Sequence, residues 1–308
     1  MSEQISIRGR AARRVVDRAN HLPFLKGSAL ELRMKLSERE HIWRCPSHLE
    51  LEQINMGQFH MELLHARRRP DTGQPNGIIL QLHGGGYYGK LKNVYRDMAG
   101  LYWELSKGLD VLSVDYRVAP EHPYPAALQD AMAAYQWVFE HNYDTGHIYV
   151  VGDSAGGGLT LALTMALRDH KMPMPKGLIT MSAWTDLTKS GESYKENFDI
   201  DPVFGRIDGS MIFQDGYYQE HSPADSYISP IMGDYTGFPP MLMQVGEYEM
   251  LLSDTLTVAQ KAKDAGVLVK VHVYPGMFHV FQMGQLLYPE SKEAWQEAGV
   301  FIRRLQKQ

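Results

Sequence analysis

The pentapeptide at residues 152–156, which reads Gly-Asp-Ser-Ala-Gly, constrains the fold more than any other stretch of this chain. It lies between an apolar run at residues 147–151 and a helical pattern at residues 159–167. A glycine two positions on either side of a serine allows a strand to turn sharply into a helix, because a side chain there would collide as the chain reverses. The motif therefore predicts a nucleophile elbow that presents the hydroxyl of Ser154 above a sheet.

Strand-like and helix-like segments alternate along the chain, which predicts an open α/β sheet. Residues 49–54 and 59–64, separated by a turn at Gly57, predict an antiparallel pair at one edge of this sheet. Short apolar runs then predict buried parallel strands at residues 78–82, 111–114, 148–151, 178–181, 241–245 and 267–273. Helical patterns between them cover residues 126–140, 159–170, 252–265 and 290–305.

Composition excludes several function classes. The chain has 308 residues and 44% apolar content, which is enough for a sizeable core, and its charges are interspersed with a net value of -5. We therefore expect no nucleic-acid partner. The N-terminal region carries arginines without a continuous apolar run, which argues against a signal peptide, and no apolar run is long enough to span a membrane. The single cysteine, Cys45, suits a reducing, cytoplasmic location.

A glycine-rich tetrapeptide at residues 83–86, His-Gly-Gly-Gly, directly follows the predicted strand at residues 78–82. It lies at the carboxyl end of that strand, where open α/β sheets place their ligand sites. Consecutive glycines let backbone N–H groups face a substrate, and such donors stabilise an oxyanion by roughly 3 kcal/mol each. We predict an oxyanion hole formed by the N–H groups of Gly85, Gly86 and Ala155. Gly84 is the close alternative.

A serine hydroxyl is a poor nucleophile at neutral pH, so a base must accept its proton. His279 is the candidate among 13 histidines, because it lies on a loop after the last predicted strand and completes the chain order Ser, acid, His. The acid is expected among three carboxylates at residues 247–254, which follow the predicted strand at residues 241–245. Glu249 is the candidate and Asp254 the alternative, because Asp254 is placed to cap the helix that begins nearby.

Four stretches resemble the bacterial branch of the hormone-sensitive-lipase family of α/β-hydrolases, at residues 83–86, 115–127, 152–158 and 249–254. The resemblance runs from about residue 50 to the end of the chain. It implies an α/β-hydrolase fold, with a mostly parallel eight-stranded sheet flanked by helices and a helical cap. It also implies an esterase for short-chain acyl esters that needs no metal or organic cofactor. Finally, it places the acid at Glu249, where many relatives have aspartate in an Asp-Pro-Leu string.

Two segments fit the alternation of strands and helices poorly, residues 1 to about 45 and 187 to about 218. Insertions of this kind often cover the site of α/β enzymes. Together with the family resemblance, they predict a helical cap at residues 1–45 and 187–220. The catalytic domain is then expected at residues 46–186 and 221–308.

Relatives often associate through the last strand and helix, so a homodimer through about residues 267–300 is expected.

Tyr87, Tyr88 and Asp153 are expected to contact the substrate, because they flank the predicted site. For Asp153, shaping the elbow or contacting a cap residue is the alternative. Large aromatic groups beside the oxyanion hole would favour small esters over triglycerides. Residues 115–127 contain three prolines and are expected to form a rigid turn. Within it, the family resemblance implies that Asp115 and Arg117 pair and brace the oxyanion loop.

These predictions describe a serine carboxylesterase with a Ser-His-Glu triad that acts on a small-molecule ester through an acyl-enzyme. The same groups would serve a deacetylase, a lactonase or an amidase, and the sequence does not separate these reactions. A non-catalytic small-ligand receptor is a further alternative. Plant hormone receptors that resemble this family lose the histidine, whereas His279 is present here.

Overall fold

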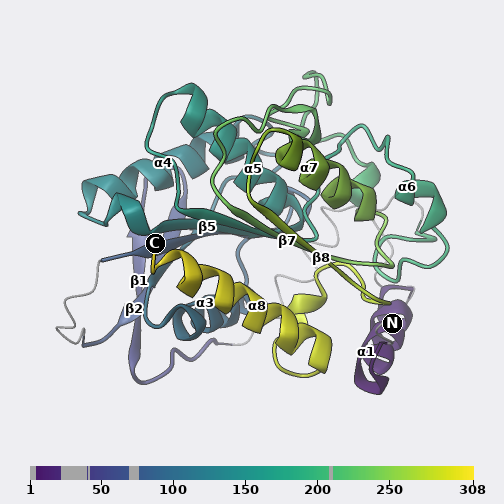
Figure 1. Ribbon diagram of the computed structural model, residues 1–308, viewed down its shortest axis with the longest axis horizontal. Helices are drawn as coiled ribbons and strands as arrows, with labels where there is room; N and C mark the ends of the chain where they lie inside the picture. The colour runs from purple at the N-terminus through teal and green to yellow at the C-terminus, as the bar shows by residue number, and fades with distance from the viewer. Residues whose placement is uncertain (1–4, 22–39, 41, 69–75, 208–210) are drawn as a thin grey trace.

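The computed structural model describes residues 5–21, 40, 42–68, 76–207 and 211–308. Its centre is an eight-stranded sheet with the order β1-β2-β4-β3-β5-β6-β7-β8 (Figure 1). β2 pairs antiparallel with both β1 and β4, and all other neighbours are parallel. The strands are β1 (Leu49–Asn55), β2 (His60–Ala66), β3 (Ile78–Leu82), β4 (Asp110–Asp115), β5 (Ile148–Asp153), β6 (Gly177–Met181), β7 (Met241–Gly246) and β8 (Val269–Tyr274).

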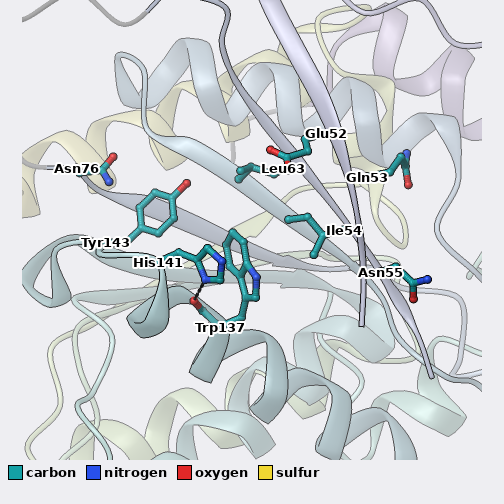
Figure 2. Close-up of a pocket in the computed structure, with 9 residues that line it drawn as sticks. All are labelled: Glu52, Gln53, Ile54, Asn55, Leu63, Asn76, Trp137, His141 and Tyr143. Carbon is teal, nitrogen blue, oxygen red and sulfur yellow. Dashed lines mark hydrogen bonds between the residues drawn. The ribbon is translucent and has the colours of Figure 1, made fainter. Parts of the chain in front are cut away.

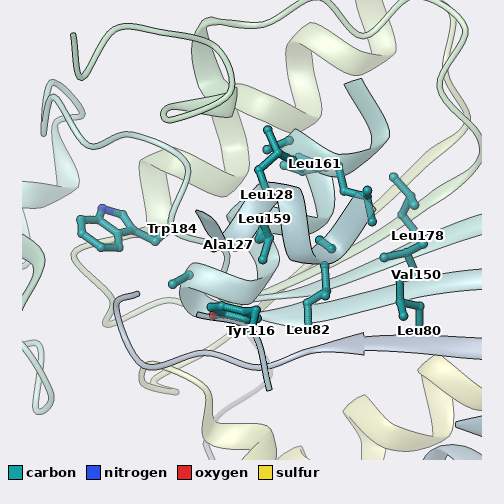
Figure 3. Close-up of a cluster of buried hydrophobic side chains, with 14 of the residues drawn as sticks. Leu80, Leu82, Tyr116, Ala127, Leu128, Val150, Leu159, Leu161, Leu178 and Trp184 are labelled. Atoms are coloured by element: carbon teal, nitrogen blue, oxygen red, sulfur yellow. The ribbon is translucent and has the colours of Figure 1, made fainter. Parts of the chain in front are cut away.

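Helices cover both faces of the sheet (Figure 1). Those on one face are α4 (Ala126–Glu140), α5 (Ser154–Asp169) and α7 (Leu252–Asp264), and those on the other are α3 (Asn93–Ser106) and α8 (Pro289–Leu305). Alternate residues of β3 enter the two cores, since Leu80 and Leu82 pack toward α4 and α5 while Ile79 packs on the opposite face (Figure 3). Burial on both faces explains why the central strands are almost continuously apolar.

Helix α5 is the most deeply buried helix near the predicted elbow. Every residue from Ser154 to Leu167 is buried. Figure 3 shows Leu159 and Leu161 of this helix above Leu82 and Val150 of the sheet. The helix that follows Ser154 is therefore held on all sides, which fixes the position of the serine.

The predicted sheet is confirmed, and each strand lies within two residues of its predicted bounds. Helix α5 begins at Ser154 rather than residue 159, because the glycines of the elbow already form its first turn. Helix α3 was not predicted, although its buried residues Tyr95, Met98, Ala99 and Tyr102 have helical spacing. The packing of α3 on the sheet therefore had a readable signal in the sequence.

The two predicted cap segments contain α1 (Ile7–Asn20), the short helix α6 (Ser193–Glu196) and the 3-10 turn η3 (Met211–Phe213). Residues 1–4, 22–39, 41 and 208–210 of these segments lie outside the described residues, and the division into cap and catalytic domain stays a prediction. The remaining 3-10 turns are η2 (Thr145–His147), η4 (Pro230–Met232) and η5 (Phe281–Gly284). Within the described ranges, none of the helices combines the length and apolar character needed to cross a membrane.

Candidate active site

Ser154 lies at the sharp turn between β5 and α5, with a positive φ of 52°. A Cβ atom added to Gly152 would lie 2.2 Å from the carbonyl oxygen of Gly156, and one added to Gly156 would lie 2.1 Å from that of Leu82. Both distances are far below normal contact. Gly152 is therefore required because the first turn of α5 folds back onto it, and Gly156 because this turn packs directly against the end of β3.

His279 connects Ser154 to Glu249. Its Nε2 atom lies 2.9 Å from Ser154 Oγ, and its Nδ1 atom lies 3.1 Å from Glu249 Oε2. Glu249 is fully buried, and its other oxygen accepts hydrogen bonds from Ser182 Oγ at 2.7 Å and from the N–H of Gly246. The structure thus brings together the three residues expected to form a triad, on loops that follow β5, β7 and β8.

Ser182 is a member of this arrangement that the sequence reasoning missed. It follows β6 with a positive φ of 50°, and its Oγ donates to Glu249 Oε1 while accepting from the N–H of Val280 at 3.0 Å. The hydroxyl therefore joins the loop of the acid to the loop of the histidine. A small polar residue at the carboxyl end of a central strand is the only signal that could have identified it.

Asp254, the alternative acid, lies elsewhere. It belongs to the first turn of α7, but it does not cap this helix as expected, because the N-cap position is Leu251. Its buried Oδ2 accepts from the N–H groups of Thr185 and Asp186 at 2.7 and 2.8 Å, so it holds the chain after β6. Burial raises the pKa of Asp254 well above its usual range. The geometry leaves Glu249 as the carboxylate beside His279.

The geometry of the glycine-rich loop distinguishes Gly84 from Gly85 and Gly86 as possible oxyanion donors. The N–H of Gly84 donates to Tyr95 Oη at 2.9 Å and to Asp153 Oδ1 at 3.1 Å, so this amide is already occupied. Gly85 and Gly86 adopt positive φ values of 112° and 62°, and both line the same pocket as Ser154. These conformations are open to glycine at no steric cost. Among the three glycines, Gly84 has its amide engaged within the protein, whereas Gly85 and Gly86 line the pocket beside Ser154, and their role as oxyanion donors stays a prediction.

Ala155 follows Ser154 in the first turn of α5. The first N–H groups of a helix have no partner within the helix, so the amide of Ala155 can donate to a ligand above the serine. This location agrees with the third predicted oxyanion donor. The positive end of the helix dipole adds to the same effect.

Asp153 lines the pocket, but its carboxylate is engaged within the protein. Oδ1 accepts from the N–H of Gly84, and Oδ2 accepts from Tyr95 Oη at 3.2 Å. The predicted role of Asp153 in binding substrate therefore becomes, in this geometry, a role in holding the oxyanion loop against the elbow.

The protonation of Asp153 carries a testable consequence for stability. Burial raises its pKa from 3.8 to about 7, although the charge of His279 and the bonds from Tyr95 and Gly84 oppose the shift. Between these values the folded protein holds a proton that the unfolded chain has lost, so stability falls as pH rises. The loss is at most about 1.4 kcal/mol per pH unit, or about 2 kcal/mol from pH 5 to pH 7.

The substitution Asp153→Asn mimics the neutral acid, and we expect it to remove this loss. Urea unfolding of both proteins at pH 5 and pH 7 measures the effect. The variant should gain about 2 kcal/mol relative to the wild type on going to pH 7. An identical pH dependence for the two proteins would show that Asp153 is ionised throughout this range.

Ser154 and His279 open into a pocket of about 810 Å³. Gly85 and Gly86 lie at the same pocket. The remaining walls come from α1, from the second predicted cap segment and from the chain around η5, namely Arg8, Ala12, Val15, Val16, Val203, Phe204, Phe278, Val280, Met283, Gly284, Leu287 and Tyr288. The chain thus provides a mostly apolar cavity of the size that holds small-molecule ligands.

Tyr87 and Tyr88 do not fulfil the expectation that they form the pocket wall. Tyr87 is 1% exposed and stacks on Tyr217 at a centroid distance of 3.6 Å, and Tyr88 is 5% exposed. Both side chains turn into the core beneath the glycine-rich loop, because the positive φ of 64° at Tyr87 directs the chain away from the cavity. They support the loop from behind.

The expected pair of Asp115 and Arg117 is also wrong. Arg117 forms a bidentate ion pair with Asp130 of α4, with its shortest contact at 2.7 Å. Asp115 accepts from the N–H of Leu91 at 2.9 Å, so it alone braces the segment after the glycines. Side chains two residues apart on an extended chain point to the same side, so the spacing alone allowed this pair. The fold instead places Asp130 of α4 within reach of Arg117.

His83 is fully buried beside the glycines and does not act as a base in this geometry. Its ring stacks on Tyr116 at 4.1 Å, and its Nδ1 atom lies 2.8 Å from the carbonyl oxygen of Gly84. Burial lowers the pKa of His83, so the ring is neutral at neutral pH. It orders the oxyanion loop.

A second pocket of about 580 Å³ lies between β1, β2 and the end of α4 (Figure 2). His141 stacks on Trp137 at 3.7 Å there, and its Nδ1 atom bonds the carbonyl oxygen of Trp137. The lining contains neither Ser154 nor His279. This pocket therefore offers no counterpart to the nucleophile and base described above.

Comparisons with known proteins agree with this site. The sequence profile of the α/β-hydrolase fold matches residues 79–283. An acetyl-hydrolase from Streptomyces hygroscopicus is 35% identical over 230 residues, which cover 75% of this chain and 76% of that protein. An esterase from Acinetobacter venetianus is also 35% identical, covering 74% of this chain and 75% of the relative.

Solved structures extend the similarity over nearly the whole chain. EstE5, in a crystal soaked with p-nitrophenyl butyrate, is 30% identical with a TM-score of 0.87 and covers 99% of this chain and 100% of its own. An esterase described as a member of the bacterial hormone-sensitive lipase family is 30% identical with a TM-score of 0.85, covering 98% and 99% of the two chains. In sequence and in fold, this chain belongs to the bacterial hormone-sensitive-lipase family of α/β-hydrolases.

Proposed function

We propose that this protein is a serine carboxylesterase that hydrolyses short-chain acyl esters through an acyl-enzyme. The observation that carries the proposal is the hydrogen-bonded series from Ser154 Oγ through the two ring nitrogens of His279 to Glu249. A carboxylate at Nδ1 holds the proton of a neutral imidazole there, which leaves Nε2 free to accept the proton of the serine.

In the acylation step, Ser154 Oγ attacks the carbonyl carbon of the ester while His279 Nε2 takes the hydroxyl proton. The carbonyl oxygen becomes an oxyanion, which the N–H groups of Gly85, Gly86 and Ala155 stabilise. When the intermediate collapses, the bond from carbon to the alcohol oxygen breaks. The alcohol leaves with the proton from His279, and the acyl group remains on Ser154.

Deacylation repeats these transfers with water in place of the alcohol. His279 takes a proton from the water as its oxygen attacks the acyl carbon, and the same N–H groups stabilise the second oxyanion. The proton then returns to Ser154 Oγ as the acyl bond breaks. Glu249 stays ionised and stabilises the imidazolium in both steps.

The short-chain preference is supported by the relatives rather than by Tyr87 and Tyr88, which lie outside the pocket. One relative is named an acetyl-hydrolase, and a crystal of another was soaked with a butyrate ester. A cavity of about 810 Å³ beside Ser154 has room for both the acyl and the alcohol parts of such an ester.

Hydrolysis of p-nitrophenyl esters from acetate to palmitate tests this proposal. We expect kcat/KM for acetate and butyrate to exceed that for palmitate by about 100-fold, or about 3 kcal/mol of transition-state binding. Spontaneous hydrolysis without enzyme is the control. Activity confined to long-chain emulsions would contradict the short-chain assignment, and no activity on any ester would contradict the esterase itself.

A deacetylase, a lactonase or an amidase would use the same groups. Parallel assays with p-nitroacetanilide and with small lactones therefore separate these reactions from ester hydrolysis. A receptor that binds without turnover is disfavoured because His279 keeps hydrogen-bond distance to both neighbours. Tight binding of a small ester with no release of alcohol is the result that would support a receptor.

We also propose that the protein forms a homodimer through β8 and α8. Strand β8 lies at the edge of the sheet and pairs with β7, and an edge strand is a ready template for pairing with another chain. Leu268 just before it is 76% exposed, and Val300 of α8 is 56% exposed. Light scattering that gives the mass of a single chain at working concentration would remove this proposal.

A further inference from the structure

The loop that carries Glu249 is held from outside by the second predicted cap segment. Ser193 Oγ donates to the carbonyl oxygen of Met250 at 2.6 Å and accepts from the N–H of Ser253 at 2.9 Å. Asn197 Nδ2 donates to the carbonyl oxygens of Glu247 and Glu249 at 3.0 and 2.7 Å. Because these bonds are to the backbone of the loop, they fix the backbone position from which the Glu249 side chain extends.

Asp201 completes this set from a fully buried position. Its Oδ2 accepts from the N–H of Met250, the residue directly after the acid, at 2.8 Å. Its Oδ1 accepts from the N–H groups of Val203 and Phe204 at 2.7 and 3.1 Å. One carboxylate therefore ties the acid loop to the turn at residues 201–204.

That turn contacts the other side of the catalytic histidine. The ring of Phe204 lies 4.5 Å from the imidazole of His279, and both Val203 and Phe204 line the pocket. His279 thus has Glu249 at its Nδ1 atom and Phe204 against its ring. Asp201 accepts from the N–H of Met250, the residue after Glu249, and from the N–H of Phe204 itself.

We propose that Asp201 is a positioning residue for catalysis, which sets Glu249 and Phe204 around His279, and that it supports the loop of the acid together with Ser193 and Asn197. This inference rests on the proposed esterase function for its kinetic test. An aspartate that only shaped a turn would need the bonds to Val203 and Phe204 alone. The bond to Met250 crosses to another loop and has no role in that turn.

The substitution Asp201→Asn tests the proposal with little change in size. Whichever way the amide is oriented, its NH₂ group faces either the N–H of Met250 or those of Val203 and Phe204, so one connection is lost. We expect kcat/KM on p-nitrophenyl acetate to fall by about 10- to 100-fold, because a small displacement of the groups that orient a base costs this much. Asp199→Asn, an exposed position two residues earlier, is the matched control and should match the wild type.

A double-mutant cycle that combines Asp201→Asn with Glu249→Gln separates a positioning role of Asp201 from a general destabilisation of the fold. If Asp201 acts through the acid, adding Asp201→Asn to Glu249→Gln should cost much less than it costs alone. An equal cost in both backgrounds would overturn the proposal. So would wild-type kcat/KM in the single variant.

Hydrogen exchange of residues 247–253 provides a readout that needs no substrate. We expect faster exchange at Met250 and its neighbours in Asp201→Asn than in Asp199→Asn or the wild type, since the amide of Met250 loses its acceptor. Labelling of Ser154 by a fluorophosphonate should slow in the same variant. If the wild type hydrolysed no ester, the proposed function would fail, whereas the exchange measurement would still decide the role of Asp201; unchanged exchange would refute it.

Discussion

Replacement of Ser154 by alanine is expected to lower kcat for p-nitrophenyl acetate by about 10⁵- to 10⁶-fold, as removal of a nucleophile does in other serine hydrolases. The reason is that, in the proposed mechanism, Ser154 Oγ attacks the ester, and this atom lies 2.9 Å from Nε2 of His279, the proposed base. The oxyanion donors and His279 remain in the variant, but without a nucleophile they leave only slow attack by water. Initial rates at saturating substrate measure the effect.

Ser222→Ala is the matched control, because it removes a hydroxyl from an exposed serine far along the chain from the elbow. It should keep the wild-type rate. A fluorophosphonate should label the wild type and Ser222→Ala but not Ser154→Ala. Without a nucleophile, only a very small residual rate is expected. If Ser154→Ala kept more than about one hundredth of the wild-type rate, another group would have to attack the ester.

Glu249→Gln should have the second largest effect, a fall in kcat of about 10⁴-fold. An amide oxygen can still accept from Ser182 and Gly246, and the NH₂ group then faces His279 Nδ1. This NH₂ donor favours the tautomer whose proton lies on Nε2. In that tautomer, His279 cannot accept the proton of Ser154, so the base is lost although the packing is kept.

Asp254→Asn is the comparison that decides between the two acids. Both main-chain donors to Asp254 bond the same oxygen, so an amide oxygen in that place keeps them. Because burial raises the pKa of Asp254 well above its usual range, the amide also resembles the neutral form that burial favours. We expect kcat/KM near the wild-type value. A loss as large as that of Glu249→Gln would mean that Asp254 takes part in catalysis.

The sequence predicted those parts of the site that backbone geometry dictates. Gly152 and Gly156 are needed because any Cβ would collide with a neighbouring carbonyl, so the elbow can be recognised from five residues. The succession of strands along the chain follows from their apolar runs, and the positions of Ser154 and His279 follow from loops at the carboxyl ends of parallel strands. These features depend on local sequence patterns, which is why they could be read without a structure.

The directions of individual side chains could not be predicted from the sequence in the same way. Tyr87 and Tyr88 follow the glycines directly, yet the positive φ at Tyr87 turns both rings into the core. Arg117 bonds Asp130, 13 residues away on α4, rather than the nearer Asp115. Such choices depend on which tertiary neighbours lie within reach, and no periodicity in the sequence reports them.

The same limit hid Ser182 and Asp201. Each joins loops that are far apart in the chain, since Ser182 bonds Glu249 and Asp201 bonds Met250. A single serine or aspartate in a loop has many ordinary roles. Only the assembled fold shows that both lie around one histidine.

Helix α1 lines the pocket but lies outside the buried core that holds Ser154. Arg8, Ala12, Val15 and Val16 line the cavity, whereas the helix itself is attached by polar contacts at its surface, from Ser6 to Glu290 and from Arg13 to the carbonyl oxygen of Gly276. The chemistry, by contrast, rests on strands and on α5 in the buried core. The α1 part of the cavity wall is therefore separate from the elements that hold Ser154. We expect substitutions at Ala12, Val15 or Val16 to change which esters bind while the buried core and the elbow stay as they are.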